Sequence, residues 1–174
     1  MWTSTQSPVG DLRVIANGTA ITAIEFAGPQ AESTSRHSSV HRAAALSAGR
    51  PVGDREESDP LLVEAVRQLH AYFARDLKEF DLPLVPSGTV FQQSVWAELT
   101  RIGYGQTVSY GEVATRLGLK VAASRAVGLA NGRNPIPIVI PCHRVVGANG
   151  TLTGYGGGVE RKQILLELEQ DALF

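Results

Sequence analysis

The chain contains a single cysteine, Cys142, and this limits how the fold can be held together. With no second thiol there can be no intramolecular disulfide, so the sulfur is either a buried apolar side chain or a reactive group. At 174 residues, of which 43% are hydrophobic, the chain can bury a substantial core in one compact unit or two small ones. We therefore expect a soluble globular protein that is stabilised by apolar packing.

The cysteine lies in the tetrapeptide Pro141-Cys142-His143-Arg144, which follows an apolar run over 135–140. Prolines at 135, 137 and 141 predict that the chain approaches the thiol in a stiff, extended form. His143 and Arg144 are cationic or cationisable neighbours of a thiol that reacts only as a thiolate. The spacing alone leaves both a buried structural cysteine and a catalytic one open.

The composition excludes several classes of protein. The longest apolar stretches are far shorter than a bilayer span, and the N-terminus lacks a basic segment followed by an apolar one. One cysteine excludes a multi-cysteine zinc site, and the four histidines have no metal-ligand spacing. We expect a cytoplasmic protein with no membrane partner, no metal and no cofactor.

Charge is distributed unevenly along the chain. Residues 1–87 carry eight basic and eleven acidic side chains (net −3), whereas residues 88–174 carry eight and six (net +2). The segment 88–150, which includes the cysteine, has six basic and two acidic side chains. This weak bias is compatible with nucleic-acid binding, although a solvated surface has the same composition.

The first half reads as an α/β unit, residues 1–86. Alternating apolar residues around Asn17-Gly18 predict a β-hairpin over 11–26 whose turn has two residues with positive φ. Residues 28–59 are polar and small, which predicts a long surface connection. Asp59 and Pro60 predict the start of a helix that runs to about residue 75. Alternation over 80–84 predicts a further strand.

The second half, residues 87–174, reads as mainly helical. Phe91, Val95 and Leu99 share a helical stripe, and we expect Trp96 beside it in the core. Ser109-Tyr110-Gly111-Glu112 has the form of a capping box, so a helix should begin at Tyr110 and run to Gly118. A second helix over 121–131, rich in alanine, completes a candidate helix-turn-helix with Arg125 as its one long side chain.

Several motifs occur together in the order of one known family. They are Ser109–Glu112, Ser124-Arg125-Ala126-Val127-Gly128, Asn134-Pro135, Ile140–Val146 and Thr153-Gly154-Tyr155-Gly156-Gly157-Gly158. The chain resembles the O6-alkylguanine-DNA alkyltransferases, also called methylated-DNA–protein-cysteine methyltransferases. The match is dense over 88–170, weaker over the hairpin and the 60–75 helix, and absent over 28–59. The resemblance implies an α+β fold, with an N-terminal ribonuclease-H-like sheet domain and a helical C-terminal domain that carries the helix-turn-helix.

The resemblance also implies a reaction. Cys142 would take an alkyl group irreversibly from O6-alkylguanine, and from O4-alkylthymine, so that each chain acts once without a cofactor. His143 would be the base through a bridging water, and Glu169 would orient it. Tyr110 would protonate or hydrogen-bond the departing guanine. Glu169 has independent support, because it falls at the margin of an apolar helical stripe formed by Ile164, Leu165 and Leu168.

The implied partner is double-stranded DNA, bound by a monomer through the minor groove with the damaged nucleotide rotated out. A groove about 6 Å wide admits only small side chains, which accounts for the alanine-rich helix. Arg125 would fill the vacated stack. The implied DNA-binding residues are Tyr110, Gly111, Ala123, Arg125 and Ala126, and cooperativity on DNA stays open.

Further residues are implied to form the substrate pocket: Val145, Tyr155, Gly156, Gly157 and Asn134. Asn134 would tie the helix-turn-helix to the cysteine segment. Some relatives carry serine where this chain has Gly156, so we expect a looser pocket that admits larger alkyl groups such as benzyl.

Three other functions remain as alternatives. A lesion binder that transfers no alkyl group would have another residue in place of the cysteine, but Cys142 is present here. A regulator of the adaptive-response type would need a zinc-bearing sensor domain, which a chain with one cysteine lacks. A cysteine hydrolase would need an oxyanion site and would turn over repeatedly.

Overall fold

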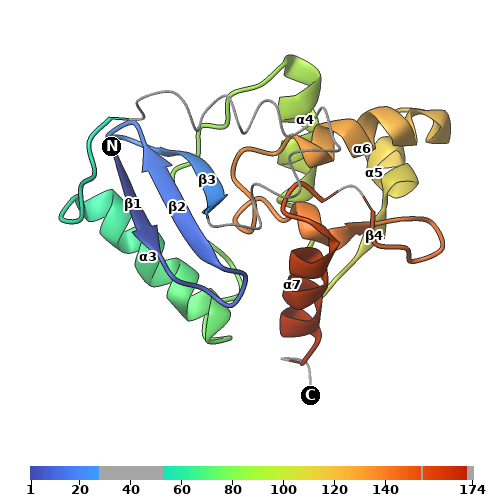
Figure 1. Ribbon diagram of the computed structural model, residues 1–174. Coiled ribbons are helices and arrows are strands. Elements are labelled where there is room, and N and C mark those ends of the chain that lie inside the picture. Colours follow the sequence, from blue (N-terminus) through green and yellow to red (C-terminus); the bar gives the residue numbers. More distant parts are fainter. Residues whose placement is uncertain (28–52, 154, 172–174) are drawn as a thin grey trace. The chain divides into compact units, whose positions relative to one another are not determined.

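The computed structural model describes residues 1–27, 53–153 and 155–171, and the chain divides into two compact units, Met1–Pro86 and Ser87–Phe174 (Figure 1). Most of the segment expected to be a surface connection, 28–59, therefore lies outside the described residues. Within the part of the chain that the structure describes, every helix is too short or too polar to cross a membrane.

The first unit is a small antiparallel sheet with one helix. Its strands β1 (Trp2–Thr5), β2 (Asp11–Ala16) and β3 (Ile21–Ala27) lie side by side in chain order. Leu12 and Val14 alternate along β2 and are fully buried. Helix α3 (Pro60–Phe73) packs against β1 and β2, and Figure 1 shows it lying along the sheet. The predicted hairpin and helix are both confirmed.

The hairpin turn differs in detail from the expectation. Of the connecting residues 17–20, only Gly18 has a positive φ (97°). The connection is therefore not a turn with two such residues. Instead, the Asn17 Oδ1 accepts hydrogen bonds from the backbone N–H groups of Thr19 and Ala20, at 3.0 and 2.9 Å. A side chain that satisfies two backbone donors stabilises this longer four-residue connection.

Helix α3 begins as its sequence predicts. The Asp59 carboxylate accepts hydrogen bonds from the backbone N–H groups of Leu61 and Leu62, at 3.1 and 3.0 Å. These bonds satisfy two of the donors that a helix N-terminus leaves without partners.

The strand predicted over 80–84 is wrong. Leu84 makes only an isolated bridge to Ile21. This bridge consists of two hydrogen bonds, from Ile21 N–H to Pro83 O and from Val85 N–H to Ile21 O. The backbone N–H and C=O of Asp81 bond instead to the side-chain amide of Gln68, at 2.8 and 2.9 Å. A side chain of α3 thus takes the place of a neighbouring strand.

The second unit is mainly helical, as expected. Its helices α4 (Val90–Leu99), α5 (Tyr110–Arg116), α6 (Ser124–Gly132) and α7 (Val159–Asp171) are joined by two short 3₁₀ turns and two two-residue strands. The turns are η1 (Val121–Ala123) and η2 (Cys142–Arg144), and the strands are β4 (Val108–Ser109) and β5 (Val145–Val146).

The two helices of the predicted helix-turn-helix are present, with one change. Ser109 and Glu112 form both hydrogen bonds of the capping box, so α5 begins at Tyr110. Gly118, with a φ of 74°, follows its end. The segment predicted as one helix over 121–131 is the turn η1 followed by α6, which packs against α5.

Two connections hold this unit together around the cysteine. Trp96 of α4 is buried, as predicted, and its Nε1 donates a 2.8 Å hydrogen bond to the Ala130 carbonyl of α6. Strands β4 and β5 pair in parallel, with Val108 opposite Val145 and Ser109 opposite Val146. The start of α5 therefore lies beside the segment that follows Cys142.

We predict that Trp96→Phe lowers the free energy of unfolding by about 1–3 kcal/mol, because it leaves the Ala130 carbonyl without its donor. Urea titration followed by circular dichroism would measure the change. Trp2→Phe, at a half-buried tryptophan in β1, is the control. A loss at Trp96 no larger than that at Trp2 would contradict the prediction.

Candidate functional site

The chain does not approach the cysteine in an extended form, contrary to the expectation from its prolines. Over 136–140 it turns back, with a 2.9 Å hydrogen bond from Ile140 N–H to Ile136 O and a φ of 75° at Ile138. The Asn134 side chain holds this turn. Its amide donates to Ile140 O at 2.8 Å, and its oxygen accepts from Ile136 N–H at 3.0 Å.

Cys142 lies at the start of η2 and is almost fully buried, with 3% of its surface exposed. Its backbone N–H donates to Ile140 O at 2.8 Å, and its carbonyl accepts a 3.3 Å bond from the Asn131 side chain. Burial raises the pKa of the Cys142 thiol to about 11, although a hydrogen bond from Asn134 and the charge of Lys162 act in the opposite direction. The resting group is therefore a thiol.

Glu169 of α7 is the centre of a buried hydrogen-bond network. Its carboxylate accepts a 2.7 Å bond from the His143 Nε2 and bonds of 3.0 and 2.9 Å from the Arg144 Nε and Nη2. It also accepts from Gly105 N–H at 3.2 Å, and the Arg144 Nη1 donates to Ile102 O at 2.6 Å. His143 and Arg144 are thus engaged by Glu169 rather than by the thiol.

The network fixes the form of the histidine. Burial acts to raise the pKa of Glu169, but hydrogen bonds from His143 and Arg144 outweigh it and lower that pKa to about 2. Burial lowers the pKa of His143, so the ring is neutral and donates its Nε2 hydrogen to the ionised carboxylate. The Nδ1 then carries a lone pair, and no described residue donates a hydrogen bond to it.

Lys162 belongs to this site, and the sequence did not reveal it. Its side chain is fully buried, and its Nζ donates hydrogen bonds to the carbonyls of Val145 and Thr153. Burial lowers the pKa of Lys162 to about 8, and the charge of an ionised Cys142 acts in the opposite direction. It is the cation whose charge favours the thiolate.

The buried face of α7 is not the apolar stripe that was expected. Ile164 is 38% exposed, and charged residues lie on the buried side. The buried residues of α7 are Arg161, Lys162, Leu165, Leu166 and Glu169. One signal could have found Lys162: it precedes Leu165 by three positions and Glu169 by seven, which places all three on one helical face.

Tyr110 begins α5, as predicted, and its Oη donates a 2.7 Å hydrogen bond to the Thr153 carbonyl. The same carbonyl accepts from the Lys162 Nζ at 2.9 Å, and this Nζ lies 5.8 Å from the centre of the Tyr110 ring. Burial raises the pKa of the phenol, so Tyr110 is protonated and able to donate.

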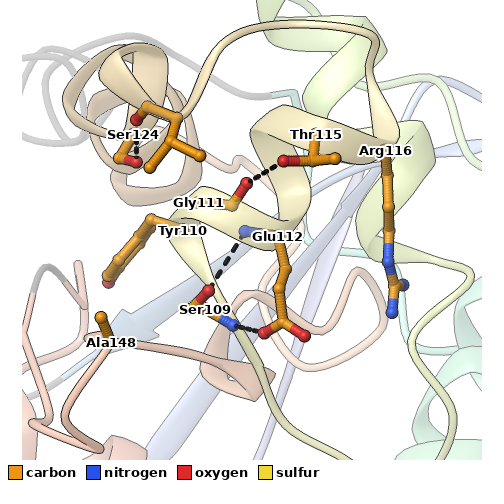
Figure 2. Close-up of a pocket in the computed structure, with 9 residues that line it drawn as sticks. Ser109, Tyr110, Gly111, Glu112, Thr115, Arg116, Ser124 and Ala148 are labelled. Carbon is orange, nitrogen blue, oxygen red and sulfur yellow. Dashed lines mark hydrogen bonds between the residues drawn. The ribbon is translucent and has the colours of Figure 1, made fainter.

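A cavity of about 490 Å³ opens beside Tyr110 (Figure 2). It lies between α5, the start of α6 and the loop at Ala148, and Figure 2 shows the Tyr110 ring and Gly111 along its wall. Of the predicted site residues, only these two line it. Its other lining residues are Ser109, Glu112, Thr115, Arg116, Val121, Ser124 and Ala148.

The other predicted residues fall into two groups. On α6, Arg125 and Ala126 are exposed, and Ala123 at the end of η1 is half-buried. Around the cysteine, Val145, Tyr155 and Gly157 are buried, whereas Gly156 is exposed. Among the described residues, no three His, Cys, Asp or Glu side chains gather closely enough to bind a metal ion.

Comparison with known families identifies both units. The protein-family model for the DNA-binding domain of 6-O-methylguanine DNA methyltransferase matches residues 90–171. The family model for the ribonuclease-like domain of the same enzymes matches residues 1–86. The chain belongs to the 6-O-methylguanine DNA methyltransferase family. The resemblance inferred from the motifs is thereby confirmed, as is the α+β fold class.

Curated relatives of this methyltransferase-family chain carry the name methylated-DNA–protein-cysteine methyltransferase. One from Methanosarcina acetivorans is 58% identical over 113 residues, which cover 65% of this chain and 72% of the relative. Another from Mycobacterium tuberculosis is 63% identical over 106 residues, which cover 61% of this chain and 64% of the relative. The aligned part is thus slightly under two thirds of the mycobacterial protein.

Solved structures of the family match over almost the whole chain. The Mycobacterium tuberculosis protein OGT, crystallised in complex with DNA, is 43% identical with a TM-score of 0.82, and the match covers 98% of this chain and 93% of that one. The O6-methylguanine-DNA methyltransferase of Pyrococcus kodakaraensis is 31% identical with a TM-score of 0.64, covering 97% and 99%.

We predict that Glu169→Gln changes how the stability of this methyltransferase-family chain depends on pH. Because the pKa of Glu169 is lowered from 4.5 to about 2, its stabilising effect is complete above pH 4.5 and is lost as the pH falls toward 2. Urea unfolding at several pH values in this range should give a flatter profile for the variant, with a loss of about 3–5 kcal/mol at neutral pH. Exposed Glu167→Gln is the control, and equal profiles for Glu169→Gln and the parent would refute the prediction.

Proposed function

We propose that this chain repairs O6-alkylguanine in DNA, and O4-alkylthymine, by moving the alkyl group irreversibly onto Cys142. The observation that carries this proposal is the chemical state of the site. A buried thiol is followed directly in the chain by a neutral imidazole whose Nε2 is held by an ionised carboxylate and whose Nδ1 lone pair is available. This is the order of nucleophile, base and orienting group that nucleophilic catalysis requires.

The proposed step balances its bonds and its proton. The Nδ1 of His143 takes the proton of Cys142 through a bridging water, and the thiolate attacks the alkyl carbon in line. The new S–C bond forms as the O6–C bond breaks, and the bonding pair goes to guanine. Guanine then gains a proton equivalent to the one that the thiol lost. A thioether is not cleaved under mild conditions, so each protein acts once.

Lys162 supplies the charge for this step. The thiol is buried, so a thiolate without a nearby cation would be costly. The carbonyls of Val145 and Thr153 hold the Lys162 ammonium in place, and its charge lowers the pKa of Cys142. We infer that Lys162 stabilises the developing thiolate, while Glu169 balances the charge of Arg144.

Tyr110 is the proposed donor to the departing guanine. In the free protein its hydroxyl already donates to Thr153 O, so an entering base must compete for this hydrogen. Thr153 O retains its bond from Lys162 when Tyr110 turns to the base. This second donor reduces the cost of the exchange, because the Thr153 carbonyl keeps one of its two donors within the protein.

The proposed DNA-binding element is α5, η1 and α6, bound to the minor groove of double-stranded DNA by a monomer. Ala123, Ala126 and Gly111 bring small groups to a groove about 6 Å wide. Exposed Arg125 on α6 is the side chain proposed to occupy the stack that the rotated nucleotide leaves.

The proposed pocket for the rotated base is walled by Val145, Tyr155, Gly156 and Gly157, and Asn134 has the structural role of holding the turn before Cys142. A Cβ atom at Gly156 would lie 3.2 Å from the Gly132 carbonyl at the end of α6. The glycine therefore allows a close approach of loop and helix. Whether it also admits larger alkyl groups stays a prediction.

Stoichiometry tests the function directly. Incubation with excess O6-methylguanine duplex should move at most one methyl group onto each chain, and peptide mass spectrometry should find it on Cys142. Cys142→Ser should abolish transfer while it leaves duplex binding nearly unchanged. Repeated turnover, or a methyl group on another residue, would exclude the proposal.

The role of Arg125 gives a second prediction. Arg125→Ala should slow transfer from duplex DNA on the order of tenfold or more, because the rotated state loses the group that fills the stack. Transfer from the free alkylated base should stay unchanged, since no stack is opened. Exposed Arg133→Ala is the matched control. Normal binding and repair of duplex by Arg125→Ala would remove this role.

A further inference from the structure

A wall of the proposed pocket is built from three successive glycines. Gly156, Gly157 and Gly158 follow Tyr155, and Gly158 has a φ of 91°. Glycine has the largest conformational freedom of any residue, so a run of three has a high entropic cost of ordering. Such a wall has no side chains of its own with which to hold its position.

Neighbouring elements hold this wall from two directions. On one side, the Cβ that Gly156 lacks would meet the Gly132 carbonyl of α6 at 3.2 Å. On the other, the Arg161 Nη1 of α7 donates a 3.0 Å hydrogen bond to Gly157 O. Backbone bonds from Gly158 N–H to Tyr155 O and from Lys162 N–H to Gly158 O hold Gly158, the last residue of the run.

The burial of Arg161 at this contact carries a cost in lost hydration of its charge. Its side chain is buried, with 6% of the residue exposed, and burial lowers the pKa of its guanidinium. A buried cation is tolerated when hydrogen bonds compensate for its lost hydration. Gly157 is itself buried, so its carbonyl needs a donor from within the protein.

We propose that Arg161 is a positioning residue that limits the size of the transferred alkyl group by bracing the glycine wall through the Gly157 carbonyl. This inference rests on the proposed transfer to Cys142. With the brace, the wall keeps a fixed distance from the bound base, and a bulky group on O6 meets rigid backbone. Without it, the wall yields to a bulky group and also holds guanine less firmly.

Variants of Arg161 test this proposal through a ratio of rates. We would measure transfer from duplexes with O6-methylguanine and with O6-benzylguanine. Arg161→Met keeps the packing but removes the donors, and it should raise the benzyl-to-methyl rate ratio on the order of tenfold. Arg161→Lys keeps the charge with a less suitable geometry, so its rate ratio should lie between those of the parent and Arg161→Met. It also covers the case in which the methionine variant does not fold.

The control is Arg67→Met, the same change at an arginine of α3 that is 61% exposed. If both transfer rates fall together, so that the ratio matches that of the control, Arg161 has only a structural role and the proposal is overturned.

Amide hydrogen exchange separates this proposal from the proposed function. The N–H groups of 156–158 should exchange faster in Arg161→Met than in the parent and in Arg67→Met. Unchanged exchange overturns the brace, whatever the rates. If the parent chain transfers no alkyl group, the proposed function fails, whereas the exchange result still decides whether Arg161 holds the wall.

Discussion

A single buried carboxylate organises the site. Glu169 receives hydrogen bonds from His143 and Arg144 of η2 and from the backbone of Gly105, and Arg144 continues to the Ile102 carbonyl. One side chain of α7 thereby joins the cysteine segment to the turn that follows α4. The orientation and the protonation of the imidazole follow from this arrangement, because an ionised acceptor requires the hydrogen on Nε2.

The groups that interact with Glu169 and the cation that acts on the thiol come from different parts of the chain. Cys142, His143 and Arg144 form one 3₁₀ turn, in which successive side chains point about 120° apart. The Cys142 side chain thus points in a different direction from those of His143 and Arg144, which both bond to Glu169. The cation that lowers the pKa of the thiol, Lys162, comes from a residue twenty positions away. Because burial raises the pKa of Cys142, the proposed transfer requires that a proton first be removed from the thiol.

The sequence predicts best where a structure depends on near neighbours. The cap at Asp59 and the capping box at Ser109 involve residues within three positions, and both were found as expected. The turn before the cysteine was missed because the Asn134 side chain, and not the prolines, determines the backbone there.

The strand expected over 80–84 failed for a related reason. Gln68, distant in sequence, supplies the hydrogen bonds that a neighbouring strand would make. Arg161 and Lys162 were also missed, since cations on a helix are usually solvated and only the tertiary structure places these two on the buried face. The motifs identified the chemistry, but the residues that support it come from contacts across the fold.

The parallel pairing of β4 with β5 has a consequence for the precision of the site. Because Ser109 lies opposite Val146, the phenol of the next residue and the sulfur four positions before Val146 keep a fixed offset along the two strands. Side chains alternate between the faces of a strand, so a shift of one residue would turn β5 over and move the proposed donor, Tyr110, away from the proposed nucleophile, Cys142. Two pairs of backbone partners therefore set the separation of the two groups that the proposed reaction brings to the base.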